Sequence, residues 1–219
     1  MENKSFGFLT SLTFIKRLLS AIIIIPVMIL PVFFGAYILI VIYLIILTFV
    51  VDEIFNIIKY SQRKILSTIY LFIGIFSIIS FIILILSSNV KEFFILIITA
   101  IWIFDTFSYL GGTIFKGKKI FPNISKGKTY SGLFTGLIST TIFCFYIINY
   151  FNSIEFISYY LILIVAILSF AGDTVVSFLK RSARTKDSGN LIPGHGGFLD
   201  RLDSFIFVFF IINIYLLLS

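Results

Sequence analysis

Residues 18–51 read LLSAIIIIPVMILPVFFGAYILIVIYLIILTFVV, and this run of 34 residues decides the fold class of the chain. It contains no charged side chain. A single helix of that length would measure about 51 Å, whereas the hydrocarbon core of a bilayer is about 30 Å thick. The run therefore predicts two membrane-spanning helices, with Pro31 and Gly35 at the break between them.

Basic residues flank this predicted hairpin at both ends. Lys16 and Arg17 precede it, and Lys59, Arg63 and Lys64 follow it. Lysine and arginine accumulate on the cytoplasmic side of membrane proteins. Both ends of the hairpin are therefore expected to lie in the cytoplasm.

The composition of the whole chain also indicates an integral membrane protein. Of its 219 residues, 59% are hydrophobic and 12% are charged, whereas about a quarter of an ordinary soluble domain is charged. The net charge of +7 in so apolar a chain favours an anionic membrane surface or an anionic substrate as partner, and not nucleic acid. The single cysteine, Cys144, excludes an intramolecular disulfide and a cysteine-based metal cluster.

Further apolar segments are expected to span the membrane at residues 65–87, 93–109, 133–151, 156–179 and 205–218. Together with the hairpin they predict an all-α, polytopic membrane helix bundle of about seven transmembrane helices, in a single domain over residues 1–219. The N-terminus and the loops at 59–64, 110–132 and 180–204 would then face the cytoplasm, with 16 of the 17 Lys and Arg residues. We expect a multi-pass protein of the cytoplasmic (inner) membrane, with a catalytic half at residues 93–219 and its active site on the cytoplasmic side.

A polar stretch separates the last two predicted helices. Residues 177–203 read SFLKRSARTKDSGNLIPGHGGFLDRLD and contain five basic residues, three aspartates and His195, the only histidine of the chain. So many ionisable groups in an apolar chain predict a functional site. Gly196 and Gly197 permit backbone conformations closed to other residues, as close approach to a ligand requires. His195 by itself fits either a general base or a residue that makes loop hydrogen bonds.

The candidate metal ligands are Asp173, Asp187, Asp200 and Asp203. Asp173 ends the apolar part of its segment, and Asp200 and Asp203 share a face if the last helix begins just before them. Carboxylates without a cysteine cluster or a histidine pair suit Mg²⁺ better than zinc. The alternative is that Asp200 and Asp203 only pair with Arg201 and Lys180.

Charged residues also occur near the ends of other predicted helices. Asp105, in AIWIFDTFSYLGG, is expected about one turn before the cytoplasmic end of its helix. Such a carboxylate usually faces the bundle interior or an aqueous cavity, and Tyr109 lies four residues further on the same helix face. The alternative is a carboxylate that reaches out to the membrane interface. Asp52 and Glu53 are interpreted as interfacial charges at a helix end.

The loop at residues 111–132, GGTIFKGKKIFPNISKGKTYSG, is rich in lysines, glycines and hydroxyl groups. The segment from Gly112 to Lys118 matches the GxxxxGK of a P-loop, but Lys119 follows in place of Ser or Thr and no strand precedes it. The same groups are suited to binding a polyphosphate without that fold. The alternative is that this basic loop only sets the topology and contacts anionic lipids.

Residues 177–203 closely resemble the signature of the phosphatidate cytidylyltransferases, also called CDP-diacylglycerol synthases, which is approximately S-x-x-K-R-x4-K-D-x-G-x2-[LIF]-P-G-H-G-G-x-x-D-R-x-D. The matching residues here are Ser177, Lys180, Arg181, Lys186, Asp187, Gly189, Pro193, Gly194, His195, Gly196, Gly197, Asp200, Arg201 and Asp203. Upstream, a family motif with an aspartate, an aromatic and paired small residues resembles Asp105, Tyr109, Gly111 and Gly112. A family loop of the type S-P-K-K-T-x-x-G resembles Ser125, Lys128, Thr129 and Gly132, with departures at Lys126 and Gly127.

The resemblance implies an Mg²⁺-dependent enzyme of phospholipid biosynthesis that transfers a cytidylyl group from CTP to phosphatidic acid, giving CDP-diacylglycerol and pyrophosphate. It also implies the lipid bilayer as a partner and suggests a homodimer. The residues assigned to catalysis are Asp173, Lys180, Arg181, Asp200, Arg201 and Asp203, and the metal ligands among the aspartates are Asp173, Asp187, Asp200 and Asp203. Those assigned to substrate binding are Asp105, Tyr109, Ser125, Lys128, Thr129, Lys186, His195, Gly196 and Gly197.

Physical reasoning agrees with this chemistry on two points. Two anionic substrates approach each other only with cations between them, so metal ions, lysines and arginines should supply most of the catalysis. A largely ionised phosphate needs little help from a base, so His195 is expected to have a structural or phosphate-contacting role. The alternatives are a related enzyme, such as a CTP-dependent polyprenol kinase or an archaeal CDP-archaeol synthase, and a cation-coupled transporter, because intramembrane aspartates also mark ion paths.

Overall fold

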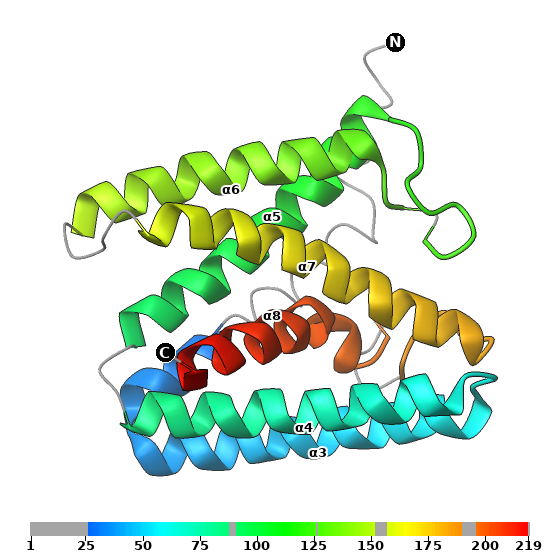
Figure 1. Ribbon diagram of the computed structural model, residues 1–219, viewed down its shortest axis with the longest axis horizontal. Coiled ribbons are helices and arrows are strands. Elements are labelled where there is room, and N and C mark those ends of the chain that lie inside the picture. Colours follow the sequence, from blue (N-terminus) through cyan, green and yellow to red (C-terminus); the bar gives the residue numbers. More distant parts are fainter. Residues whose placement is uncertain (1–25, 88–90, 126, 152–156, 190–195, 219) are drawn as a thin grey trace.

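The computed structural model describes residues 26–87, 91–125, 127–151, 157–189 and 196–218. Its long helices are α3 (Ala36–Tyr60), α4 (Lys64–Ser87), α5 (Lys91–Phe115), α6 (Tyr130–Phe151), α7 (Ile157–Ser182) and α8 (Leu199–Leu218), as shown in Figure 1. Among the described residues, an isolated antiparallel bridge joins Lys119 and Thr129, and no strand is assigned. The prediction of an all-α structure is confirmed.

These six helices are all long and apolar enough to cross a membrane, with candidate spans of 18 to 25 residues. At 1.5 Å per residue, such spans match a hydrocarbon core of about 30 Å. Helices are suited to this environment because they satisfy their backbone hydrogen bonds internally. The predicted polytopic bundle is confirmed, and the first of the seven predicted helices, which begins at residue 18, is described from residue 26 onwards.

The predicted hairpin breaks at Gly35. This residue has φ +110° and separates a helical segment at residues 26–34 from α3. Only glycine adopts such a conformation without strain. Pro31, in contrast, lies within the helical segment and not at the break. The Tyr43 hydroxyl donates a 2.7 Å hydrogen bond to the Met28 carbonyl, so the segment folds back along α3.

Several helix ends differ from their predicted positions. Helix α5 continues to Phe115, so Gly111 and Gly112 are helical and not part of the following loop. Asp105 therefore lies ten residues before the end of its helix, not one turn before it. The physical reason is close packing on α6, because a Cβ atom at Gly111 would collide with the Thr135 side chain. These glycines allow α5 and α6 to pack closely, and small residues are typical of such helix contacts in membrane proteins.

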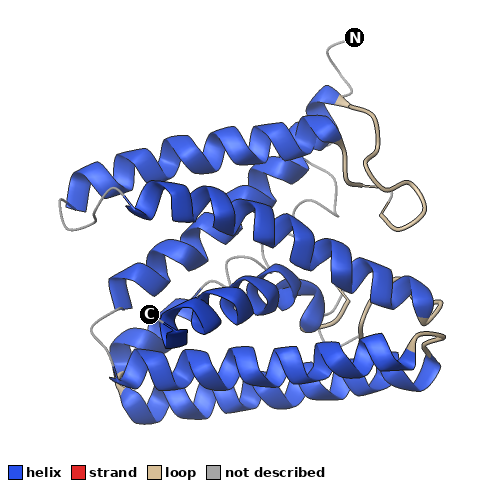
Figure 2. Cartoon of the chain, viewed as in Figure 1, coloured by secondary structure: helices blue, strands red, loops and turns tan. Residues whose placement is uncertain are grey.

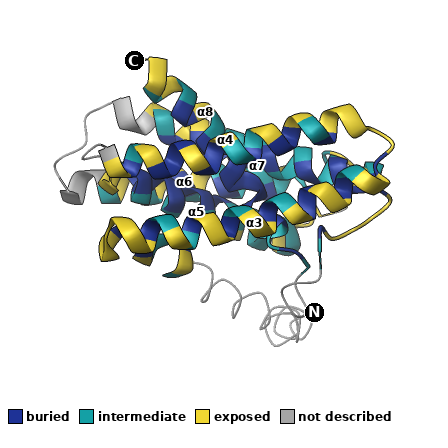
Figure 3. Ribbon diagram, turned by 90° about the horizontal axis from the view of Figure 1, so that it is seen from below, coloured by how far each residue is buried: buried dark blue, intermediate teal, exposed yellow. Residues whose placement is uncertain are grey.

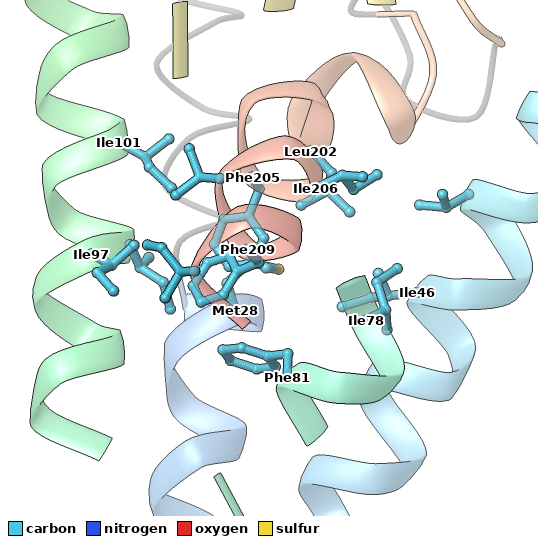
Figure 4. Packing of buried hydrophobic residues seen from close by; sticks show 14 of the residues in the cluster. Met28, Ile46, Ile78, Phe81, Ile97, Ile101, Leu202, Phe205, Ile206 and Phe209 are labelled. Carbon is cyan, nitrogen blue, oxygen red and sulfur yellow. The ribbon is translucent and has the colours of Figure 1, made fainter. Parts of the chain in front are cut away.

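The core of the bundle lies around α8, which packs against α7 and α4. Phe209 is fully buried there, with ring centroids 4.9 Å from Phe81, 5.5 Å from Phe94 and 4.2 Å from Phe205. Figure 4 shows Phe81 of α4 close to Phe205 and Phe209 of α8. Large apolar residues such as Phe72 and Phe134 remain exposed, and Figure 3 shows the exposed positions on the outer faces of the helices. Faces of this kind are suited to contact with lipid.

The connections that follow α3, α5 and α7 gather at one side of the bundle (Figure 2). The Gln62 amide in the first connection donates a 3.1 Å hydrogen bond to the Ser182 carbonyl at the end of α7. Arg181 Nε, one residue earlier, donates to the Ile124 carbonyl in the second connection at 3.2 Å. Residues far apart in the sequence are thus brought together where the site residues lie.

Replacing Gly172 in α7 by alanine is expected to destabilise the protein by about 1–3 kcal/mol, because the added methyl group overpacks a close helix contact. Its Cβ would lie 2.7 Å from Phe207 Cβ and 2.9 Å from the Asp203 carbonyl oxygen of α8. The midpoint of thermal unfolding in detergent measures the effect, with a thiol-reactive dye that reports exposure of the buried Cys144.

The matched control is Gly74→Ala in α4, where a Cβ would meet its nearest neighbour at an ordinary 3.5 Å. Alanine is the better helix former by about 1 kcal/mol, so this variant should unfold at the wild-type temperature or above. If both variants unfold at the same temperature, close contact at Gly172 is not what holds α7 and α8 together.

Candidate active site

Carboxylates from three helices converge at the centre of the candidate site. Asp173 comes from α7 and Asp203 from α8, which approach closely at Gly172. Asp105 comes from α5, and the Ser169 hydroxyl of α7 donates a 2.9 Å hydrogen bond to its Oδ1. The three carboxylates are close enough to repel one another. Asp105 therefore faces the bundle interior, as predicted, and the alternative of a side chain directed to the membrane interface is wrong.

Lys128 reaches into this cluster from the connection between α5 and α6. Its Nζ lies 3.1 Å from Asp173 Oδ2 and donates a 2.8 Å hydrogen bond to Thr174 Oγ1. It also lies 5.2 Å from the centre of the Phe170 ring. Burial lowers the pKa of the Lys128 ammonium, while the charge of Asp173 and the hydrogen bond to it act in the opposite direction. A cation is thus held in a largely desolvated position beside the carboxylates.

Lys180 and Asp200 form a second ion pair. The distance from Nζ to Asp200 Oδ1 is 2.5 Å, and only 10% of each side chain is exposed. The structure shows this pairing, and the assignment of Asp200 as a metal ligand stays a prediction. The pairing does not conflict with a phosphate site, because buried ammonium groups and carboxylates side by side are what a metal-bound polyphosphate would contact.

The second oxygen of Asp200 holds the connection that precedes α8. Its Oδ2 accepts hydrogen bonds from the Ser188 amide at 2.9 Å and from the Gly197 amide at 3.0 Å. Gly196 has φ +84°, and a Cβ there would lie 2.6 Å from Asp200 Oδ2 and 3.1 Å from Asp187 Cβ. The predicted need for glycine is confirmed at Gly196. Lys186 and Asp187 are exposed, and His195 lies outside the described residues.

The connection between α5 and α6 is itself well folded. The Ile120 amide donates to the Lys128 carbonyl at 3.0 Å, which closes the connection into a narrow turn. Thr129 caps the N-terminus of α6, because its Oγ1 accepts a 3.1 Å hydrogen bond from the Gly132 amide. Ser125 lies half-buried in this turn. No strand precedes the GxxxxGK segment, which begins within α5, and the P-loop interpretation is therefore rejected.

Three further predicted residues differ in their exposure. Arg181 is exposed and bridges two connections. Its Nη1 donates a 3.0 Å hydrogen bond to the Thr185 carbonyl, and its Nε donates to the Ile124 carbonyl. Tyr109 on α5 and Arg201 on α8 are half-buried. The structure thus brings both ends of the polar stretch and the lysine-rich connection to one composite site.

Glu53 is a site residue that the sequence reasoning missed. Its residue surface is only 2% exposed, although it was interpreted as an interfacial charge. It accepts hydrogen bonds from Ser188, Phe198 and Leu199, which lie 135 to 146 positions away in the chain. Asp52, its neighbour, is exposed as expected. No local pattern distinguishes the two carboxylates, because only helix rotation against distant residues decides which of them is buried.

Comparison with known proteins identifies the family. Residues 59–219 match the family model described as "Cytidylyltransferase family". The chain belongs to the cytidylyltransferase family. The match includes every predicted site residue but begins after Glu53.

Several relatives of this chain carry the name phosphatidate cytidylyltransferase. The relative from Rickettsia typhi is 43% identical over 127 residues, which cover 53% of this chain and 56% of the relative. The one from Rickettsia bellii is 38% identical over 166 residues, covering 68% and 72%. The one from Thermotoga maritima is 38% identical over 121 residues, covering 52% and 45%. The chain spans about half the length of most of these relatives.

The donor groups of the site fit magnesium shared with a substrate. Within the described residues, no three Asp, Glu, His or Cys side chains are grouped closely enough to hold a metal ion by themselves. Mg²⁺ often binds through only one or two carboxylates, together with water and substrate phosphates. Asp173 and Asp203 supply hard oxygen atoms from adjacent helices, and Lys128 and Lys180 lie beside the carboxylates. The arrangement suits a metal that arrives with a polyphosphate.

Proposed function

We propose that the protein transfers a cytidylyl group from CTP to phosphatidic acid, forming CDP-diacylglycerol and pyrophosphate. The observation that carries this proposal is the composite site of two lysine–aspartate pairs, Lys128 with Asp173 and Lys180 with Asp200, where α7 and α8 meet the lysine-rich connection. Membership of the cytidylyltransferase family and the names of the relatives support the choice of nucleotide and lipid.

The proposed reaction joins two anions. An oxygen of the lipid phosphate attacks the α-phosphorus of CTP, the new P–O bond forms, and the bond to the β-phosphate breaks to release pyrophosphate. The chain's own contribution is to position the phosphates and balance their charge, which are the main sources of catalysis in such transfers. When bound, Mg²⁺ would neutralise phosphate charge and be held by Asp173 and Asp203. The assignment of Asp200 and Asp187 as further ligands stays a prediction.

Each ammonium group has a defined part in this proposal. Lys128 and Lys180 are preorganised by Asp173 and Asp200, so each can move its hydrogen bonds from a carboxylate to a phosphate. Arg181, Lys186 and Arg201 would provide further positive charge around the leaving pyrophosphate. We assign the rest of the binding surface to Asp105, Tyr109, Ser125, Thr129, His195, Gly196 and Gly197.

The bilayer would deliver one substrate and the aqueous phase the other. A phosphatidic acid head group lies at the membrane surface, which matches a site formed by helix ends and connections at one side of the bundle. The positive-inside pattern of Lys and Arg supports a cytoplasmic active site in the inner membrane. A homodimer remains a prediction that rests on the family resemblance.

Purified protein with CTP, phosphatidic acid and Mg²⁺ is expected to release pyrophosphate and form CDP-diacylglycerol, and chelation of the metal should abolish both products. Thin-layer chromatography of labelled lipid and a coupled pyrophosphate assay measure them. Release of CDP instead of pyrophosphate would identify a kinase. Coupled ion flux in proteoliposomes without nucleotide chemistry would identify a transporter, and either result would refute the proposal.

A further inference from the structure

Glu53 is a buried carboxylate that the proposed chemistry does not use. It lies in α3, and its residue surface is 2% exposed. Burial of a carboxylate is costly unless hydrogen bonds replace its water. Here Oε2 accepts the Ser188 hydroxyl at 2.6 Å and the Leu199 amide at 2.9 Å, and Oε1 accepts the Phe198 amide at 2.7 Å. Three hydrogen-bond donors therefore compensate the carboxylate for its loss of water.

Two of these donors belong to the start of α8. Leu199 is the first residue of that helix, and the first amides of a helix have no carbonyl partner within it. A carboxylate placed there is stabilised by the positive end of the helix dipole. Glu53 thus caps α8 from a different helix, in place of a side chain from the preceding connection.

The connection between α7 and α8 is shaped to receive this carboxylate. A Cβ at Gly189 would lie 2.8 Å from Glu53 Oε1, and a Cβ at Gly197 would collide with Oε2. Glycine at both positions lets the two ends of the connection close around one side chain. The contact is therefore specific, and not the result of a loop resting on α3.

Glu53 and Asp200 both contact Ser188 and Gly197. Ser188 donates its hydroxyl to Glu53 and its amide to Asp200. Gly197 donates its amide to Asp200 and packs against Glu53. Because Asp200 Oδ1 pairs with Lys180, the orientation of this ion pair depends on a segment that Glu53 fixes from the opposite side.

We propose that Glu53 is a positioning residue that anchors both ends of the connection between α7 and α8, so that Asp200 holds Lys180 in position to bind the phosphates. The part that concerns phosphates rests on the proposed function. The anchor itself does not, because it consists of contacts within the chain. Glu53 acts through Ser188, Phe198 and Leu199 and does not touch the reacting atoms.

The test compares Glu53→Gln with Asp52→Asn in the full-length protein. Glutamine keeps one acceptor oxygen but places an amide donor against the donors of the connection, whereas Asp52 is exposed one position earlier. Trypsin cleavage after the exposed Lys186, followed by mass spectrometry of the fragments 1–186 and 187–219, reports opening of the connection. For Glu53→Gln we expect this cleavage to be about 10-fold faster, since a buried charged hydrogen-bonding partner is lost. Asp52→Asn should match the wild type.

Steady-state kinetics give the second readout. Loss of an outer residue that orients a candidate metal ligand typically lowers activity by about 10- to 100-fold. We expect kcat of Glu53→Gln to fall in this range while KM for CTP changes by less than about 3-fold, because Lys128, which Asp173 and Thr174 hold, does not depend on this connection. Equal cleavage of Glu53→Gln and Asp52→Asn, or a loss of activity that only follows the loss of folded protein, overturns the proposal.

Ser188→Ala keeps the experiment decisive if Glu53→Gln does not fold. It removes one of the three donors and leaves the carboxylate intact, so cleavage after Lys186 should rise about 3-fold. Wild-type cleavage of this variant would refute the anchor. If wild-type protein makes no product from CTP and phosphatidic acid, the proposed function fails, and the proteolysis comparison decides the anchor alone.

Discussion

Asparagine in place of Asp200 is expected to lower kcat/KM by about 100- to 1,000-fold, the range found when one preorganised charge-stabilising group is removed. The Asp200 carboxylate accepts Lys180 with one oxygen and two backbone amides with the other. Asparagine has a single oxygen, and its amide group would oppose one of these donors. Steady-state pyrophosphate release with CTP and phosphatidic acid measures the loss.

His195→Ala provides the comparison for this variant. An ionised phosphate nucleophile needs no strong base, so the histidine variant should lose less activity than Asp200→Asn or Asp200→Ala. Thermal unfolding reported by Cys144 confirms that each variant is folded. Equal or greater loss for His195→Ala would mean that His195 takes a direct part in the chemistry, and the assignment of roles would have to be reversed.

Lys128→Met is expected to reduce kcat/KM by about 100-fold, because the variant removes an ammonium group that is held next to the carboxylates. Methionine keeps most of the length but loses the pairing with Asp173, the hydrogen bond to Thr174 and the contact of the ammonium group with the Phe170 ring. Stability should change little, since 39% of the Asp173 side chain is exposed and an unpaired carboxylate there remains solvated.

Lys118→Met is the matched control for this prediction. Lys118 lies in the same connection with an exposed side chain, and its carbonyl contact with the Tyr130 amide does not depend on the side chain. Its kcat/KM should fall by no more than about 3-fold, as expected for a solvated surface charge. Similar losses for both variants would show that the connection contributes only its overall positive charge.

The position of Asp105 was only partly predicted from the sequence. Its role as an inward-facing carboxylate followed from the cost of charge in a membrane, and the hydrogen bond from Ser169 confirms it. Its distance from the helix end was wrong, because Gly111 and Gly112 were interpreted as the start of a loop. Glycine has the same signature in a sequence whether it breaks a helix or allows another helix to approach.

The sequence by itself determined that the chain crosses a membrane several times as helices, since its apolar runs are long and only helices satisfy their own backbone there. It also determined the polar chemistry, because Asp173, Lys180 and Asp200 occur in a recognisable order. Only the tertiary structure decided which charges meet: Lys128 with Asp173, Lys180 with Asp200, and Glu53 with the start of α8. The physical reason is that a membrane helix is apolar on all sides, so its sequence does not show which face packs against which neighbour.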